Sequence, residues 1–225
     1  MVSRYEAGLG DTPGKMVLAV GVDGSGKSAF LQGISESYDV ITIEPTSTKQ
    51  AKAFKAEHFG GVFDEALVDE REAIFLDINR RLSECLDEEQ EAGYNVAASG
   101  NELVTKISHG LMRIILGNTG KTIDDLVDDW IASETKKPDE IVFLHAPDET
   151  IYHRIRRRQL RGDAQEVFWG FNEPDYLYRY QETLHSVIGK LAQTAMFNCI
   201  LLDTAMNSKY ENLNIYKDKS IIFNE

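Results

Sequence analysis

Five short apolar runs along the chain have the composition of strands that are buried on both faces. Met16–Gly21 is a continuous apolar run that ends in glycine, and Val40–Glu44 is short and β-branched. Tyr94–Ser99, Glu140–His145 and Cys199–Asp203 have the same character. A strand in a parallel sheet has no solvent-facing side, so such runs replace the alternation of a half-exposed strand. The pattern therefore predicts a parallel, five-stranded sheet.

Helical spacing fills the segments between these runs. Apolar residues recur every three or four positions within polar stretches, which is the period of one helix face. These residues are Ile74, Ile78, Leu82 and Leu86, then Ile151 and Ile155, and finally Tyr176, Tyr180, Leu184, Ile188 and Leu191. Strands that alternate with helices predict a doubly wound α/β fold with helices on both faces of the sheet.

The chain of 225 residues is long enough for one domain with a sizeable core. We expect residues 1–15, which hold several glycines, to form an arm, and residues 16–206 to form the domain. Residues 207–225 are mostly polar and are expected to be a tail that adds an edge strand or lies on the surface.

Composition narrows the classes of partner. The formal net charge is −13, which repels phosphate backbones and disfavours general nucleic-acid binding. The 2 cysteines have no metal-ligand spacing, and no signal peptide or membrane-spanning run is visible. These features favour a cytoplasmic protein with no membrane partner.

The residues after the first apolar run form the most specific motif of the sequence. Gly21–Ser28 match the pattern G-x-x-x-x-G-K-[ST] of a phosphate-binding loop, between an apolar strand and a helix. Backbone N–H groups of such a loop surround phosphate oxygens, Lys27 reaches the terminal phosphates, and the Ser28 hydroxyl binds Mg²⁺. The following helix points its positive N-terminus at the same anion. The expected triphosphate-binding residues are Gly21, Asp23, Gly24, Ser25, Gly26, Lys27, Ser28 and Ala29.

Asp23 places a carboxylate inside this loop, where most phosphate loops avoid negative charge. With this residue the loop resembles that of the thymidylate kinase family, which reads G-x-D-x-x-G-K-[ST]. The resemblance implies a P-loop kinase fold that uses ATP and Mg²⁺ and takes small-molecule nucleotides as its partners. In that family the loop carboxylate lies near the 3′-hydroxyl of the acceptor sugar, a role that falls here on Asp23. The alternative for Asp23 is a solvated turn aspartate.

Glu44-Pro45 ends the second apolar run. The carboxyl ends of parallel strands line the ligand crevice of such a sheet, so Glu44 is expected to face the site. An exposed strand end before proline is the alternative. This pair resembles both thymidylate kinases and deoxynucleoside kinases, and in the latter the glutamate acts as the base toward the 5′-hydroxyl. Glu44 is therefore a candidate for catalysis and for acceptor binding.

Phe75–Arg81, followed by Gly93, resembles the F-x-x-x-R helix of the same family. The arginine of that helix helps to hold the nucleotide, and Arg80 or Arg81 is the candidate for this role. A solvated arginine on a helix face is the alternative.

The end of the third apolar run departs from the family. An Asp-Arg pair is expected there, but residues 97–102 read Ala-Ala-Ser-Gly-Asn-Glu and contain no arginine. Asn101 or Glu102 is a candidate substitute in acceptor binding. Thr105 falls where the family's polar contacts to the base begin, and it is a further acceptor-binding candidate.

A cluster of five arginines occupies eight positions from Arg154 to Arg161. The planar guanidinium binds two phosphate oxygens at once, and phosphoryl transfer depends mainly on positioning and charge neutralisation. The order of strand, R-x-x-x-R helix and aromatic helix resembles the family's lid, which predicts a lid at about 154–172. The catalytic candidates are Arg154 and Arg158, then Arg161. The alternative is a basic helix face that pairs with nearby acidic side chains.

Several functions are compatible with these features. The first is a thymidylate-kinase-like enzyme that moves the γ-phosphate of ATP onto a deoxynucleoside monophosphate, with a pyrimidine base expected. The second is a deoxynucleoside kinase with Glu44 as base, and the third is a nucleotide-binding protein with little transferase activity. A kinase acting on a base within DNA would need a basic groove, and the sequence gives no sign of one. The resemblance also implies a homodimer, for which residues 64–93 are the candidate interface.

Overall fold

The computed structural model describes residues 12–43, 65–117, 119–161, 174–194 and 196–221. Its centre is a parallel sheet in the order β2-β3-β1-β4-β5. The strands are β1 (Met16–Val20), β2 (Val40–Ile43), β3 (Asn95–Ala98), β4 (Glu140–His145) and β5 (Asn198–Asp203). All five apolar runs of the sequence form strands within about a residue or two of the expected bounds, so the predicted fold class is confirmed.

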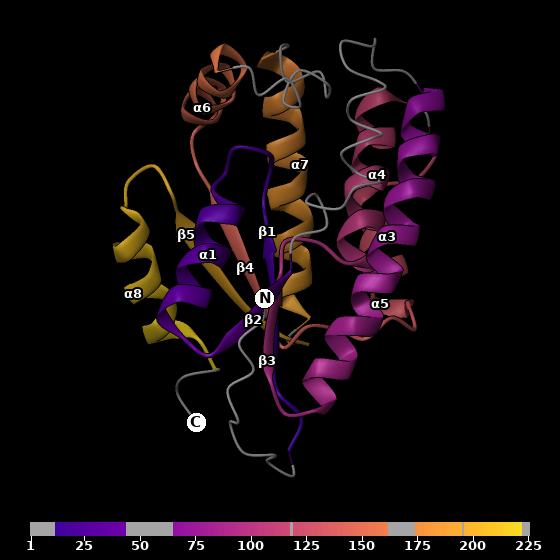
Figure 1. Cartoon of the computed structure of the whole chain (residues 1–225). Coiled ribbons are helices and arrows are strands. Elements are labelled where there is room, and N and C mark those ends of the chain that lie inside the picture. Colours follow the sequence, from indigo (N-terminus) through magenta and orange to yellow (C-terminus); the bar gives the residue numbers. More distant parts are fainter. Residues whose placement is uncertain (1–11, 44–64, 118, 162–173, 195, 222–225) are drawn as a thin grey trace.

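Helices cover both faces of this sheet (Figure 1). One face packs against α1 (Lys27–Ser37) and α8 (Lys209–Lys219). The other face packs against a larger group: α3 (Glu65–Glu91), α4 (Glu102–Leu116), α5 (Ile123–Ala132), α6 (Asp148–Leu160) and α7 (Pro174–Gln193). Among the described helices, none has the length and apolar character needed to cross a bilayer.

The apolar stripes lie where their spacing predicts. Ile78 and Leu86 of α3 are buried, and so are Leu184 and Ile188 of α7. β1 is buried along its whole length, because the sheet continues on both of its edges and helices cover both of its faces. The carboxyl end of β1 therefore lies in the middle of one rim of the sheet, and this is where the phosphate-loop motif follows.

The segments outside the expected domain are tied to it where the structure describes them. In the arm, the Gly14 amide donates to the Gln90 carbonyl, and the Lys15 amide donates to Asn95 Oδ1. Of the expected lid, residues 154–160 belong to α6, whereas 162–172 lie outside the described residues. The division of the chain into arm, domain with lid, and tail stays a prediction.

The expectation of an edge strand or a surface stretch after residue 206 is corrected by the structure. Lys209–Lys219 form α8, which begins with a reciprocal pair of hydrogen bonds between Ser208 and Glu211. Leu213 and Tyr216 of this helix are buried against the sheet and α1, and the Tyr216 ring meets Phe30 edge to face. The apolar contacts of α8 therefore complete one layer of the fold.

A buried carboxylate joins this last helix to the sheet. Glu140, at the start of β4, has 0% of its surface exposed. Its two oxygens accept hydrogen bonds from Tyr216 Oη (3.0 Å), Ser220 Oγ (2.8 Å), Asn198 Nδ2 (2.9 Å) and the Ile221 amide (2.6 Å). Burial and the adjacent Glu140 charge raise the pKa of Tyr216, which keeps its hydroxyl a donor. Four donors thus compensate the desolvation of one charge.

We predict that Glu140→Gln lowers the free energy of unfolding by about 3 kcal/mol, because the amide lacks the charge and turns an N–H group toward these donors. Urea denaturation of the wild type and the variant measures this change. Glu134→Gln, at an exposed position, is the matched control and should change the value by less than about 0.5 kcal/mol. Equal stability of the two variants would contradict the proposed contribution of the buried network.

Candidate active site

The phosphate-loop motif forms a tight turn between β1 and α1. Gly24 and Gly26 have φ angles of 84° and 106°, which residues with side chains rarely adopt. A Cβ atom on Gly21 would lie 2.5 Å from the Leu144 carbonyl oxygen of β4 and 2.5 Å from Ser25 Oγ. The glycines are therefore required by backbone conformation and by the close approach of β4. The turn leaves the loop backbone at the carboxyl rim of the sheet, next to the N-terminus of α1.

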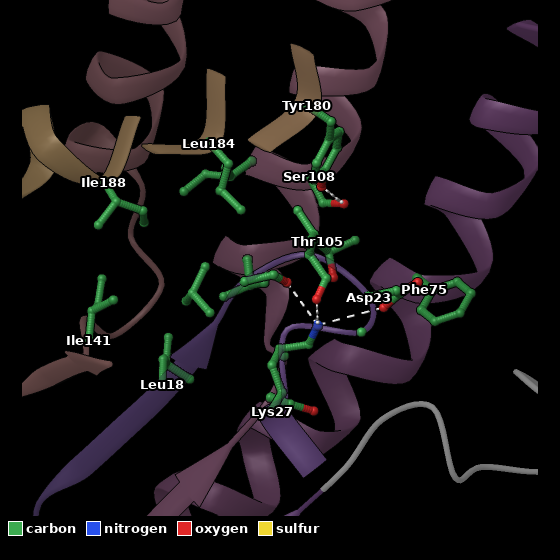
Figure 2. A pocket seen from close by; sticks show the side chains of 18 of the residues that line it. Leu18, Asp23, Lys27, Phe75, Thr105, Ser108, Ile141, Tyr180, Leu184 and Ile188 are labelled. Atoms are coloured by element: carbon green, nitrogen blue, oxygen red, sulfur yellow. Dashed lines mark hydrogen bonds and ion pairs between the residues drawn. The ribbon is translucent and has the colours of Figure 1, made fainter. Parts of the chain in front are cut away.

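Lys27 reaches back along this turn. Its Nζ donates hydrogen bonds to the carbonyl oxygens of Gly21 (2.8 Å) and Val22 (2.9 Å) and lies 3.6 Å from Asp23 Oδ1 (Figure 2). The ammonium group is thus held above the loop, with a carboxylate beside it. Since Lys27 and Asp23 both line the cavity described next, the loop contributes one positive and one negative group to it.

A first cavity of about 270 Å³, here called the inner cavity, extends from the loop between the sheet and the helices α3, α4 and α7. One wall is apolar and is formed by Leu18 of β1, Ile141 of β4, and Leu184 and Ile188 of α7 (Figure 2). Such a wall suits the flat, apolar faces of an aromatic ring better than a chain of phosphates.

The opposite side of the inner cavity carries hydrogen-bonding groups. Asn79 Nδ2 of α3 donates to Thr105 Oγ1 of α4 at 2.5 Å, and the Thr105 carbonyl oxygen lies 2.8 Å from His109 Nδ1. Ser108 Oγ and Tyr180 Oη are hydrogen-bonded at 2.8 Å, as Figure 2 shows. All five side chains line the cavity, so it combines an apolar wall with a few placed polar groups.

A second cavity of about 290 Å³, here called the outer cavity, lies on the other side of the loop. Side chains from α1, α6, β4 and the start of α8 form it: Phe30, Leu144, Arg154, Arg158, Thr204, Asn207, Lys209 and Asn212. The two cavities share Gly24, Gly26, Ala29 and Arg158. The phosphate loop is therefore a common wall between two spaces, with one arginine at both.

Thr204, just after β5, connects the parts around the outer cavity. Its Oγ1 donates to the Ser25 carbonyl oxygen at 2.7 Å and accepts from Arg154 Nη1 at 3.0 Å. Its backbone N–H donates to the His145 carbonyl oxygen of β4 at 2.8 Å. Arg154 also donates to the carbonyl oxygens of Thr204 (2.6 Å) and Gly24 (3.1 Å). One threonine and one arginine thus join β4, the phosphate loop and α6.

The charge of Arg154 is partly shielded from water in this position. Burial lowers the pKa of Arg154, and the nearby positive charge of Arg158 lowers it further. An arginine pKa is so high that the group stays charged at neutral pH. The structure therefore places two guanidinium groups of α6 close together beside the loop, where an anion would be favoured.

The expected site residues divide into three groups. Lining the inner cavity are Gly21, Asp23, Gly24, Gly26, Lys27, Ser28, Ala29, Thr105 and Arg158. Ser25 is fully buried beneath the loop, and Arg154 lies at the outer cavity. Glu44 lies outside the described residues.

The remaining four expected residues point elsewhere. Arg80 is exposed and pairs with Asp77 on its own helix at 2.9 Å, and Arg81 does the same. Asn101 caps α4, where its side chain accepts from the Val104 amide at 2.9 Å. Arg161 is exposed at the end of α6. None of these four lines either of the two cavities in the part of the chain that the structure describes.

The residues beside the loop offer few ligands for a divalent cation. No group of three His, Cys, Asp or Glu side chains suited to a metal exists among the described residues. Mg²⁺ commonly takes one or two protein oxygens, with substrate phosphates and water as its other ligands. Ser28 supplies such an oxygen, and Asp23 lies on the same cavity. The residues present therefore fit a magnesium ion that arrives with a nucleotide.

Four residues of the site were not predicted from the sequence: Asn79, His109, Tyr180 and Thr204. Asn79 lies within the apolar stripe of α3, one turn after the buried Phe75. An amide among apolar helix positions was the sequence signal that could have identified it. His109 stands one turn after Thr105 on α4. The contacts of Thr204 could not be predicted from its neighbours in the chain, because it contacts β4 and α6, which are remote in the sequence.

No model of a known protein family matches this sequence, and a search of curated proteins finds no match. Among solved structures, the chain is similar to deoxyadenosine kinase from M. mycoides with bound dATP. The two chains share 15% identity over 91% of this chain and 98% of that chain, with a TM-score of 0.66. An unliganded sugar kinase from Janibacter sp. HTCC2649 shares 17% identity over 93% and 96%, with a TM-score of 0.52. These likenesses show that the chain has the fold of P-loop kinases.

We predict that Gly21→Ala lowers the free energy of unfolding by about 3 kcal/mol, because the new Cβ meets the backbone of β4 and the φ of 156° disfavours a side chain. Gly189→Ala is the control, since Gly189 is exposed on α7 and a Cβ there meets nothing within 4 Å. This control should stabilise the protein by about 0.5–1 kcal/mol. Chemical denaturation compares the two, and a Gly21→Ala protein as stable as the wild type would contradict the close approach.

We predict that Thr204→Val lowers the free energy of unfolding by about 1–3 kcal/mol, because the Ser25 carbonyl and an Arg154 N–H lose their partner in a half-buried place. Thr204→Ser keeps the hydroxyl and should retain most of the stability. Urea denaturation of the three proteins tests this difference. A valine variant that is as stable as the serine variant would contradict the role assigned to the hydroxyl group.

Proposed function

We propose that this protein is an ATP-dependent phosphotransferase that acts on a nucleoside-type acceptor, as a deoxynucleoside kinase. The observation that carries this proposal is the position of the phosphate loop between two cavities that share Gly24, Gly26 and Arg158. A phosphoryl group passes between two bound molecules, so an enzyme of this kind needs a donor site and an acceptor site that meet at the phosphates. The outer cavity is proposed for the donor base and the inner cavity for the acceptor.

The loop residues take the roles that their positions allow. The loop amides and Lys27 hold the β- and γ-phosphates, and Ser28 holds Mg²⁺ together with phosphate oxygens. The metal ion, when bound, neutralises charge on the transferring phosphoryl group. Arg158, at both cavities, is proposed to bind oxygens of the group in transit, and Arg154 to hold the loop against α6. Arg161 stays a candidate of the lid.

The choice of a nucleoside over a monophosphate rests on the cations of the inner cavity. Among the described residues that line it, Lys27 and Arg158 are the positive ones, and both lie near the phosphate loop. Ser99 and Gly100 line the cavity at the end of β3, where the resembled family has its Asp-Arg pair. An uncharged 5′-hydroxyl needs no further arginine, and Glu44 is the proposed base toward it.

The structural neighbours include a deoxynucleoside kinase of the same fold. The deoxyadenosine kinase from M. mycoides has been solved with dATP, with the products dCMP and dCDP, and with dCTP. The two structures with dATP and with the products cover 90% or more of the present chain. Likeness at this identity supports the proposal through the shared fold alone.

A second candidate is a deoxynucleoside monophosphate kinase of the thymidylate type. It is favoured by Asp23, whose carboxylate lies at the inner cavity, where it is suited to a sugar hydroxyl. In this candidate Thr105 contacts the base, and Arg80 and Asn101 remain acceptor-binding candidates that would have to leave their present partners. Homodimerisation through residues 64–93 stays a prediction for both candidates.

The test is coupled ATP turnover with Mg²⁺ against deoxynucleosides and their 5′-monophosphates. We predict turnover with at least one deoxynucleoside, and a loss of about 10²–10³-fold in kcat for Lys27→Ala, since a charge that stabilises the transition state is removed. Lys217→Ala, at an exposed position of α8, is the matched control and should keep wild-type turnover.

The possible results separate the candidates. Turnover with monophosphates alone would replace the first candidate by the second. If ATP binds in calorimetry but no acceptor in the panel supports turnover, both kinases are contradicted and a nucleotide-binding protein with little transferase activity remains.

A further inference from the structure

Asn79 is a buried amide in the wall of the inner cavity. It has 2% of its surface exposed and lies on α3, one turn after Phe75, which lines the same cavity. Its Nδ2 group donates to Thr105 Oγ1 at 2.5 Å. Its Oδ1 atom is buried and has no hydrogen-bond partner among the described residues. Buried polar atoms in folded proteins are nearly always hydrogen-bonded, so an unsatisfied oxygen beside a cavity points to a ligand that brings a donor.

His109 lies on the same wall of the cavity and is oriented by the same threonine. Its Nδ1 lies 2.8 Å from the Thr105 carbonyl oxygen, and a carbonyl oxygen can only accept. Nδ1 therefore carries the hydrogen. In the neutral ring this leaves Nε2 with a lone pair, so any hydrogen bond that it makes in this form is as an acceptor. Thr105 thus orients two neighbours, one through its hydroxyl and one through its carbonyl.

The other polar pair of the cavity does not discriminate between donors and acceptors. Ser108 and Tyr180 are joined through their hydroxyl groups, and a hydroxyl rotates to donate or to accept. The fixed preference on this side of the cavity comes from Asn79, whose unsatisfied Oδ1 atom can only accept. A ligand edge that donates is favoured there, and an edge that carries a carbonyl oxygen is opposed.

We infer, on the basis of the function proposed above, that the acceptor base carries an exocyclic amino group, as cytosine and adenine do, and that Asn79 selects it. An amino group has an N–H bond for the unsatisfied Asn79 oxygen. A carbonyl oxygen in its place, as in uracil or hypoxanthine, would face the Asn79 oxygen and leave it without a partner. Sites built on such hydrogen bonds reject the mismatched analogue strongly, because a buried polar group then stays unpaired.

Two pairs of nucleosides isolate this one group. Deoxycytidine and deoxyuridine differ in the amino group, and so do deoxyadenosine and deoxyinosine. Calorimetry measures the Kd of each for the full chain with the non-hydrolysable ATP analogue AMP-PNP and Mg²⁺, and the matching 5′-monophosphates are measured alongside. The expected result is binding of at least one amino-bearing member at least about tenfold more tightly than its carbonyl counterpart.

Variants of Asn79 and Thr105 test whether Asn79 causes the preference for an amino group. Asn79→Leu replaces both polar atoms by methyl groups on the same branched skeleton, and the preference should fall to about twofold or less. Asn79→Asp keeps an acceptor in place and should retain an amino preference. Thr105→Val leaves Asn79 intact but removes the partner of its Nδ2, so the amide can turn and the preference should also fall. Circular dichroism checks that each variant is folded, and Thr105→Val keeps the test valid if Asn79→Leu does not fold.

Binding and turnover together separate this inference from the proposed function. An amino preference in binding without any turnover supports the role of Asn79 and contradicts the kinase. Turnover with an equal or reversed preference supports the kinase and overturns the inference. An amino preference that persists in Asn79→Leu overturns the assignment to Asn79. If no member of either pair binds, with or without phosphate, the inference is overturned, while turnover with the full panel of deoxynucleosides decides the kinase.

Discussion

The hydroxyl of Thr204 lies where three parts of the site meet, and the geometry of both cavities depends on its hydrogen bonds. It ties the loop backbone at Ser25 to the rim of β5, and Arg154 adds α6 to the same point. Because the loop is a common wall, any shift of it enlarges one cavity and narrows the other. A tightly held loop is therefore what allows two separate binding spaces to meet at a fixed distance, which phosphoryl transfer requires.

Positive charge is concentrated at the candidate site, although the chain as a whole is acidic. The chain carries a net charge of −13, yet the phosphate loop and α6 bring Lys27, Arg154 and Arg158 to one place. Ionic screening at physiological salt limits the reach of surface charges to roughly 8 Å. A nucleotide within the site is therefore governed by these nearby cations, while the acidic surface disfavours extended polyanions. This contrast favours a small phosphorylated ligand over an extended polyanion.

The sequence predicted the sheet well and the inner cavity less well, for a physical reason. Buried parallel strands are continuous apolar runs, and the phosphate loop is a local motif, so both can be recognised from neighbours in the chain. Asn79 lines the inner cavity, whereas its neighbour Arg80 is exposed and pairs with Asp77. Successive residues on a helix point about 100° apart, and only packing shows which one faces the cavity. The helix α8 was missed because few of its residues are apolar: Leu213 and Tyr216 are buried, and Ile215 packs beside them. Its Ser208–Glu211 capping pair was nevertheless readable in the sequence.

The buried Glu140 also sets an order of events during synthesis. Its partners Tyr216, Ser220 and Ile221 follow it in the chain by about eighty positions and are synthesised well after β4. Until they emerge, a carboxylate at the base of the central sheet lacks three of its four donors, and one face of β5 lacks its cover. A nascent chain stalled after β5 would hence leave exposed the apolar surface that α8 covers in the folded domain.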